Sequence, residues 1–113
     1  MDRKEILEKV LSINGDLQLL HQELKKFPWD TDFPLVVLTI DDMINVLNKV
    51  IIGNICIDVL EEWADIIECR DDIDFEHQEL QEIIFELANP LINGKLTQKR
   101  LKEIMDYLIS RRL

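Results

Sequence analysis

Residues 58–86 read DVLEEWADIIECRDDIDFEHQELQEIIFE and decide the fold. They hold twelve of the chain's 23 Asp and Glu residues but only one of its 13 Lys and Arg residues, Arg70. Such a block is typical of a disordered acidic tail, because repulsion opposes compaction. Apolar residues nevertheless recur through it at helical spacing, up to the residue that follows it: Val59, Leu60, Trp63, Ile66, Ile67, Leu80, Ile83, Ile84 and Leu87. The pattern therefore predicts folded helices with a fixed negative surface, which suits a positively charged partner.

The composition of the whole chain indicates one helical domain. It has 113 residues, of which 47% are hydrophobic and 32% charged, with only three Gly and three Pro. That length fits one domain, and so few turn residues favour helices over many short strands. We predict an all-α, single-domain helical bundle over residues 1–113, with about six helices joined by short loops.

Capping and breaking residues locate the expected helices. The first helix starts at about Ile6 and ends at Asn14-Gly15, the second covers 16–26, and the third runs from an N-cap at Thr39 to 52. The fourth covers 55–69, the fifth follows the acidic connection 70–74 and stops at Pro90, and the last begins at Thr97. Asp42 stands three residues after Thr39, as in a capping box. Residues 35–38 are β-like in composition, but no second such run follows, so we predict no stable sheet.

Patterns for metal binding and catalysis fail at specific positions. Asp72, Asp74 and Glu76 alternate like a calcium loop, but the required Gly and the closing Glu are missing. Two Cys and two His match no zinc spacing, and no serine has a His nearby in sequence. His77 is expected on the apolar side of its helix, and Cys56 as a small buried hydrophobe. We predict that the protein is not an enzyme and that it binds no metal and no cofactor.

Charge and segment lengths bear on partners and location. The net charge of −10 makes nucleic acid or an anionic membrane an unfavourable partner. Basic residues of the last segment scatter around its helix instead of sharing a face. The first residues do not resemble a secretory signal, and no apolar run reaches a bilayer's thickness. We therefore expect a cytoplasmic protein with reduced cysteines.

The outward acids and one aromatic residue make up the expected partner-binding surface. Its residues are Asp58, Glu61, Glu62, Asp65, Glu68, Asp71, Asp72, Asp74, Phe75, Glu79 and Glu82. Like charges at helical spacing cost stability, so stability alone would not favour them, and Phe75 among them is typical of an interface anchor. Alternatives stay open. In one alternative the acids form only a solvated surface. In a second, Phe75 folds inward while Arg70 pairs with Asp72 or Asp74. In a third, the aromatic segment Phe27–Phe33 is the main contact.

Three segments resemble small helical bacterial immunity proteins. They are Trp63–Glu76 with its Trp-Ala and Arg-Asp-Asp-Ile elements, Ile83–Pro90 with Leu-Ala-Asn-Pro, and Asn93–Thr97. The resemblance covers mainly residues 39–110. Proteins of this kind accompany polymorphic toxins, including those of contact-dependent growth inhibition systems. The resemblance implies a non-enzymatic cytoplasmic protein that binds one cognate toxin domain, commonly a nuclease.

Two hypotheses of function follow. The first is a toxin-neutralising immunity protein that binds a basic nuclease domain, of the RNase type, through its acidic face. The second is a regulatory adaptor or homo-oligomeric helical module with no toxin partner. The toxin's identity and the oligomeric state stay open at this point.

Overall fold

The computed structural model describes residues 2–28 and 30–112. In chain order the elements are α1 (Arg3–Ser12), α2 (Leu17–Leu24), β1 (Val36–Leu38), α3 (Ile40–Ile51), α4 (Ile57–Glu68), β2 (Ile73–Phe75), α5 (Gln78–Ala88), α6 (Pro90–Asn93) and α7 (Gln98–Arg112). The predicted all-α class is confirmed. The extra helix is α6, a single turn that starts at Pro90 where only a break was expected. None of the described helices is long and apolar enough to span a membrane.

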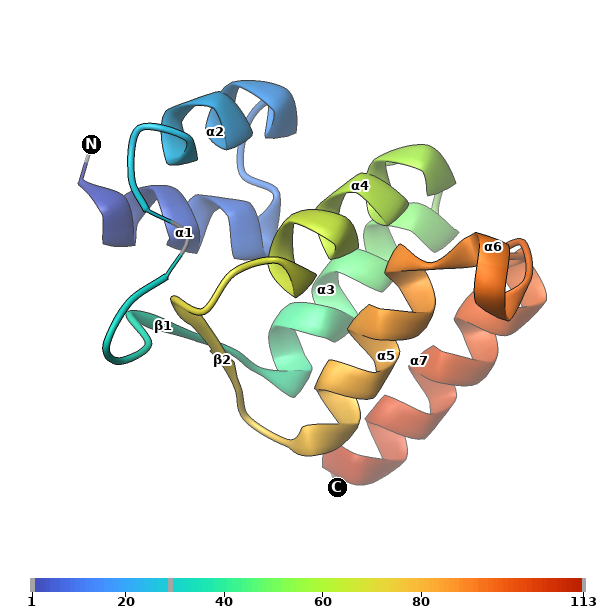
Figure 1. Cartoon of the computed structure of the whole chain (residues 1–113). Helices are drawn as coiled ribbons and strands as arrows, with labels where there is room; N and C mark the ends of the chain where they lie inside the picture. The colour runs from blue at the N-terminus through green and yellow to red at the C-terminus, as the bar shows by residue number, and fades with distance from the viewer. Residues whose placement is uncertain (1, 29, 113) are drawn as a thin grey trace.

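The helices pack in pairs around one hydrophobic core. α4 lies along α5, α3 along α7, and α1 along α2. Figure 1 shows the α1–α2 pair on one side of the molecule, α5 to α7 on the other, and α3 and α4 between them. Leu7 of α1 and Leu101 of α7 are both fully buried in the same cluster of apolar side chains. The Cα radius of gyration of 13.5 Å is that of a compact domain of this length.

A short parallel sheet corrects the prediction that residues 35–38 form no strand. Val36 pairs with Ile73, Val37 with Asp74, and Leu38 with Phe75. The sequence prediction places Ile73 and Asp74 in the acidic connection 70–74 and Phe75 on the next helix, because three residues with an exposed Asp in the middle carry too little pattern to indicate a strand. The pairing provides hydrogen-bond partners for backbone N–H and C=O groups of residues 36–38, which have no strand nearby in sequence to pair with.

Most of the predicted helix ends are observed. Thr39 accepts a hydrogen bond from the Asp42 N–H at 3.0 Å, and the Asp42 carboxylate accepts one from the Thr39 N–H at 3.0 Å. Thr97 Oγ1 accepts from the Arg100 N–H at 3.1 Å, as expected of the residue that opens α7. The end of α1 differs slightly, since its C-cap is Ile13, in the left-handed conformation at a φ of 49°, just before the expected Asn14-Gly15 pair, in which Gly15 also has a positive φ.

Two predicted side-chain positions are wrong because α4 and α5 begin later than expected. Cys56 is the N-cap of α4, where it is exposed instead of packed as a small hydrophobe. His77 is the N-cap of α5 and is also exposed, so it does not occupy the apolar side of that helix. The cysteine Cys69 follows the end of α4 and is exposed as well, and both thiols are free.

A buried ion cluster ties the first helix to the sheet. The Asp72 side chain is fully buried and accepts hydrogen bonds from Arg3 Nε at 3.0 Å and from Arg70 Nη2 at 2.8 Å. Arg3 Nη2 also donates to the carbonyls of Pro28 at 2.7 Å and Asp30 at 3.1 Å. Through the Asp72 carboxylate and its two arginines, the cluster therefore joins three segments: the start of α1, the connection after α2, and the residues just before β2. Buried charges persist only when paired and hydrogen-bonded in this way.

Candidate protein-binding surface

Three acids of the 58–86 block are paired with arginines and do not contribute free negative charge. Asp72 is held by Arg3 and Arg70, Glu79 lies 3.1 Å from Arg111, and Glu86 lies 2.7 Å from Arg100. The alternative pairing of Arg70 with Asp72 is thus the one observed. Asp72 has to be removed from the partner-binding set, because a fully buried carboxylate with two guanidinium partners cannot contact another protein.

Eight acids of the block have no ion-pair partner among the described residues. We call them together the acidic face, although Glu82 lies on a side of α5 away from the groove described below: Asp58, Glu61, Glu62, Asp65, Glu68, Asp71, Asp74 and Glu82. The first five lie on α4, two lie around β2, and Glu82 lies on α5. Six are exposed, while Glu61 and Glu62 are half-buried. The remaining acid, Glu76, lies 3.4 Å from His77.

A groove opens where β2 meets α4 and α5. Its volume is about 300 Å³. Glu68, Asp71 and Asp74 supply carboxylates, while Phe75 and Phe85 supply aromatic surface. Phe85 is 46% exposed, which is high for a phenylalanine. Glu68 Oε2 accepts a hydrogen bond from Asn89 Nδ2 at 2.9 Å, which orients that carboxylate at the groove.

The expected position of Phe75 beside Glu79 and Glu82 is wrong. Phe75 lies in β2, half-buried against the core, and lines the groove together with α4 and α5 residues. Glu79 and Glu82 lie on another side of α5 and line a different hollow, which Arg100 and Tyr107 of α7 also line. The expectation treated residues 75–82 as one helix, whereas the strand and the N-cap at His77 break the helical relation between them.

Phe85 is the groove residue that sequence reasoning missed. The predicted apolar positions of its helix do not include Phe85, because it does not follow the Leu80, Ile83, Ile84, Leu87 spacing. That departure was itself a signal, since a large aromatic residue off the buried stripe of a helix is exposed at some cost and is enriched at interfaces. Only the approach of β2 shows that Phe85 and Phe75 line the same groove.

The aromatic segment Phe27–Phe33 is anchored instead of free. Phe27 is half-buried against the core, and the carbonyl of Pro28 accepts hydrogen bonds from Arg3 and Arg70. Phe33 is 68% exposed. Trp29 lies outside the described residues. The segment thus offers one exposed aromatic ring among its described residues, and whether it is the main contact stays untested.

The pair between Glu86 and Arg100 joins α5 to α7. Arg100 donates from Nε and Nη2 to the two Glu86 carboxylate oxygens, each at 2.7 Å. The hydrogen bond from Arg100 lowers the pKa of Glu86 below its ordinary value of 4.5, against an opposing effect of burial. The same bond raises the pKa of Arg100. A two-pronged pair of this kind binds more strongly than a single contact.

This pair should contribute stability that depends on pH. Because the pKa of Glu86 is lower in the folded state, its contribution is present above pH 4.5 and is lost as the pH falls through the folded-state value. We expect Glu86→Gln to cost about 0.5–1 kcal/mol in urea unfolding at pH 7 and progressively less as the pH is lowered below 4.5. Glu82→Gln, which breaks no described ion pair, is the matched control. A Glu86→Gln cost that stays constant with pH would contradict the assignment.

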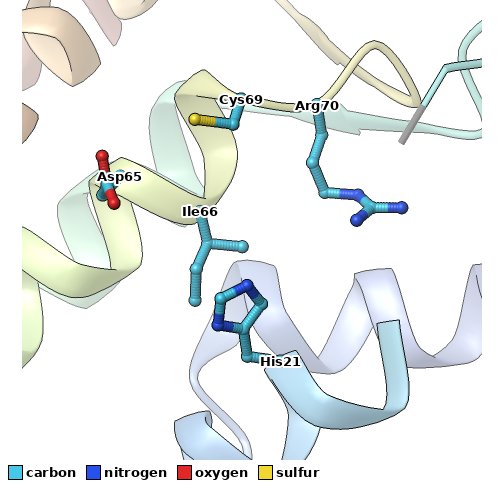
Figure 2. Close-up of a pocket in the computed structure, with 5 residues that line it drawn as sticks. All are labelled: His21, Asp65, Ile66, Cys69 and Arg70. Carbon is cyan, nitrogen blue, oxygen red and sulfur yellow. The ribbon is translucent and has the colours of Figure 1, made fainter. Parts of the chain in front are cut away.

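A second hollow, of about 540 Å³, lies between α2 and the end of α4. Figure 2 shows its lining: His21, Asp65, Ile66, Cys69 and Arg70. Ile66 reaches toward the His21 imidazole, whereas the Cys69 thiol points along α4. Burial, with Asp65 and Glu68 close by, raises the pKa of Cys69, which favours the unreactive thiol. These residues are therefore poorly arranged for nucleophilic catalysis.

No group of three or more His, Cys, Asp or Glu side chains that could hold a metal ion occurs in residues 2–28 and 30–112. The feature of this protein with the clearest binding chemistry is therefore the acidic face with its aromatic groove. Comparison of the chain with protein-family models, curated proteins and solved structures gives no match.

Proposed function

We propose that the protein is a cytoplasmic immunity protein that neutralises a cognate toxin domain, a basic nuclease of the RNase type, by binding it through the acidic face. The observation that supports this most directly is the distribution of ion pairs. Arginines of α7 neutralise Glu79 and Glu86, yet no Lys, Arg or His among the described residues pairs with the eight acids of the face. Like charges that no cation of the described residues neutralises repel one another, and binding of a positively charged partner would relieve that repulsion.

Nuclease chemistry provides such a cation. A nuclease holds the phosphate backbone with Lys and Arg, so the region around its active site is positively charged. Clustered carboxylates can occupy or cover that region. Complementary charge also steers association toward rates of roughly 10⁸–10⁹ M⁻¹s⁻¹, which favours capture of a toxin before it cuts.

Co-expression tests the proposal. The chain should restore growth to cells that express the toxin domain encoded beside it, and the two purified proteins should bind with a Kd near 1 nM, about −12 kcal/mol. The purified chain alone should degrade no nucleic acid. Failure to protect, or nuclease activity of the chain itself, would show that the proposal is wrong.

Matched charge reversals then locate the contact. Asp71→Lys and Asp74→Lys change exposed carboxylates at the groove, and Glu8→Lys changes an exposed carboxylate on α1. We expect each groove variant to weaken binding about tenfold or more, mainly through slower association at low salt, and Glu8→Lys to have little effect. Equal losses for all three would mean that only net charge matters.

The second candidate, a self-associating helical module, is favoured by one observation. In α6, Leu91 is 101% and Ile92 is 73% exposed, side by side on a single turn. Neighbouring exposed apolar residues are typical of interaction sites. If they form a dimer contact, sedimentation velocity at micromolar concentration should show a dimer that Leu91→Asp converts to a monomer. A monomeric parent protein would remove this candidate.

A further inference from the structure

The hydrogen bonds of the sheet show which way the peptide groups of β2 point. Val36 N–H donates to the Asp72 carbonyl at 3.2 Å, and Glu76 N–H donates to the Leu38 carbonyl at 2.9 Å. Residues 72 and 76 therefore face β1. Because successive peptide groups of a strand alternate in direction, the N–H and C=O groups of Ile73 and Phe75 point away from β1. β2 thus has an open edge, in the sense that no other strand of the described residues pairs with it there, although Ile73 as a whole is only 4% exposed.

That open edge borders the groove. Ile73 and Phe75 both line the groove, and Ile84 and Phe85 of α5 line it too. Of the edge groups, the Phe75 N–H donates to Asp74 Oδ1 at 2.9 Å, a local contact that the carbonyl of an added strand would have to displace. Neither Ile73 nor the Phe75 carbonyl makes a backbone hydrogen bond across this edge with another described residue. Open edges of this kind are templates for an added strand.

We propose that this edge binds an extended segment of the partner that carries Lys or Arg, which pairs with β2 as a third strand. The inference rests on the proposed function, because it specifies how the acidic face holds its partner. Charge complementarity selects the occupant. Glu68, Asp71 and Asp74 line the groove without an ion-pair partner among the described residues, whereas Arg70, which also lines it, is bound to Asp72. The outer edge of β1 instead carries the apolar residue Val37, which offers no such attraction.

The two faces of the sheet specify the pattern of the added strand. Ile73 and Phe75 lie toward the core, whereas Asp74 is exposed on the outer face. Side chains of an added strand alternate in the same way, so one set meets the aromatic floor and the next set lies beside Asp74. A segment that alternates apolar residues with Lys or Arg satisfies both faces. Main-chain hydrogen bonds would supply affinity, and the alternation would supply specificity.

A synthetic peptide tests strand addition on the full chain. The probe is a short peptide that alternates Lys and Val, and its control has the same sequence with alternate amides N-methylated, which keeps the charge but removes strand donors. On ¹⁵N-labelled protein we expect the Lys-Val peptide to shift the Ile73 and Phe75 amide signals and slow their hydrogen exchange. The N-methylated peptide should bind about tenfold more weakly or worse, because hydrogen bonds are lost. Equal binding of the two peptides would overturn the proposal.

Protein variants and the toxin domain complete the test. Asp74→Asn should weaken binding of the Lys-Val peptide several-fold, whereas Glu8→Gln, which changes an exposed acid of α1 outside the acidic face, should not. With the cognate toxin domain bound, slower exchange at Ile73 and Phe75 supports the inference. Tight toxin binding without that change means that the strand is wrong while the proposed function stands. If the peptide pairs with β2 but the chain does not protect cells from the toxin, the strand-addition site stands and the proposed function is wrong.

Discussion

Replacing Asp72 by asparagine should lower the free energy of unfolding by about 3–5 kcal/mol, the cost of breaking a buried ion pair by removing one partner. Asp72 is fully buried, and the side chains of Arg3 and Arg70 are only 18% and 9% exposed. A neutral amide keeps one acceptor oxygen but removes the negative charge, so the two guanidinium groups would lie close together without a counter-charge, held otherwise by the Pro28 and Asp30 carbonyls. Because single domains are stable by roughly 5–15 kcal/mol, the loss should be plain in urea unfolding.

The neighbouring acid is the control for this prediction. Asp71 is exposed and unpaired among the described residues, so Asp71→Asn should change the free energy of unfolding by no more than about 0.5 kcal/mol. An Asp72→Asn cost as small as that of Asp71→Asn would contradict the burial and pairing described for Asp72. The comparison also matters for function, since a weakly folded Asp72 variant would lose binding for reasons unrelated to contact.

Trp63→Ala should destabilise the protein by a similar amount, about 3–5 kcal/mol, because it empties a large buried volume. Trp63 is fully buried on α4, and its Nε1–H donates to the Val10 carbonyl of α1 at 2.8 Å. The side chain thereby fixes the α1–α2 pair to the rest of the bundle. Urea unfolding followed by far-UV circular dichroism measures the loss.

Trp63→Phe separates the hydrogen bond from the volume. Val10 O also accepts from the Ile13 N–H at 3.1 Å, so it keeps one partner in the variant. We therefore expect Trp63→Phe to lower the free energy of unfolding by less than Trp63→Ala does. The lost hydrogen bond should account for about 1 kcal/mol of that decrease. Tyr107→Ala, at a residue 44% exposed, serves as the control for removing an aromatic ring and should cost much less. Equal costs for Trp63→Ala and Tyr107→Ala would mean that Trp63 is not the anchor.

Local patterns in the sequence were sufficient for the helices and for the placement of most acids. Apolar spacing predicted that Leu60, Trp63 and Ile67 are buried, and that Asp58, Asp65 and Glu68 are exposed on the opposite side of α4. The capping box at Thr39 was equally readable. Such features depend on residues three or four positions apart, so the chain itself brings their partners together.

Tertiary structure decided what each acid and aromatic residue does. Asp71 and Asp72 are identical neighbours in sequence, yet one is exposed and the other is buried against Arg3, 69 residues away. Likewise, Phe75 and Phe85 share a groove only because β2 pairs with β1, and arginines of α7 neutralise Glu79 and Glu86 only because α7 packs beside α5. The sequence by itself therefore determined a helical protein with a concentrated negative charge. Which carboxylates stay unpaired depends on contacts between distant segments, because residues far apart in sequence meet only when the core packs their helices and strands together.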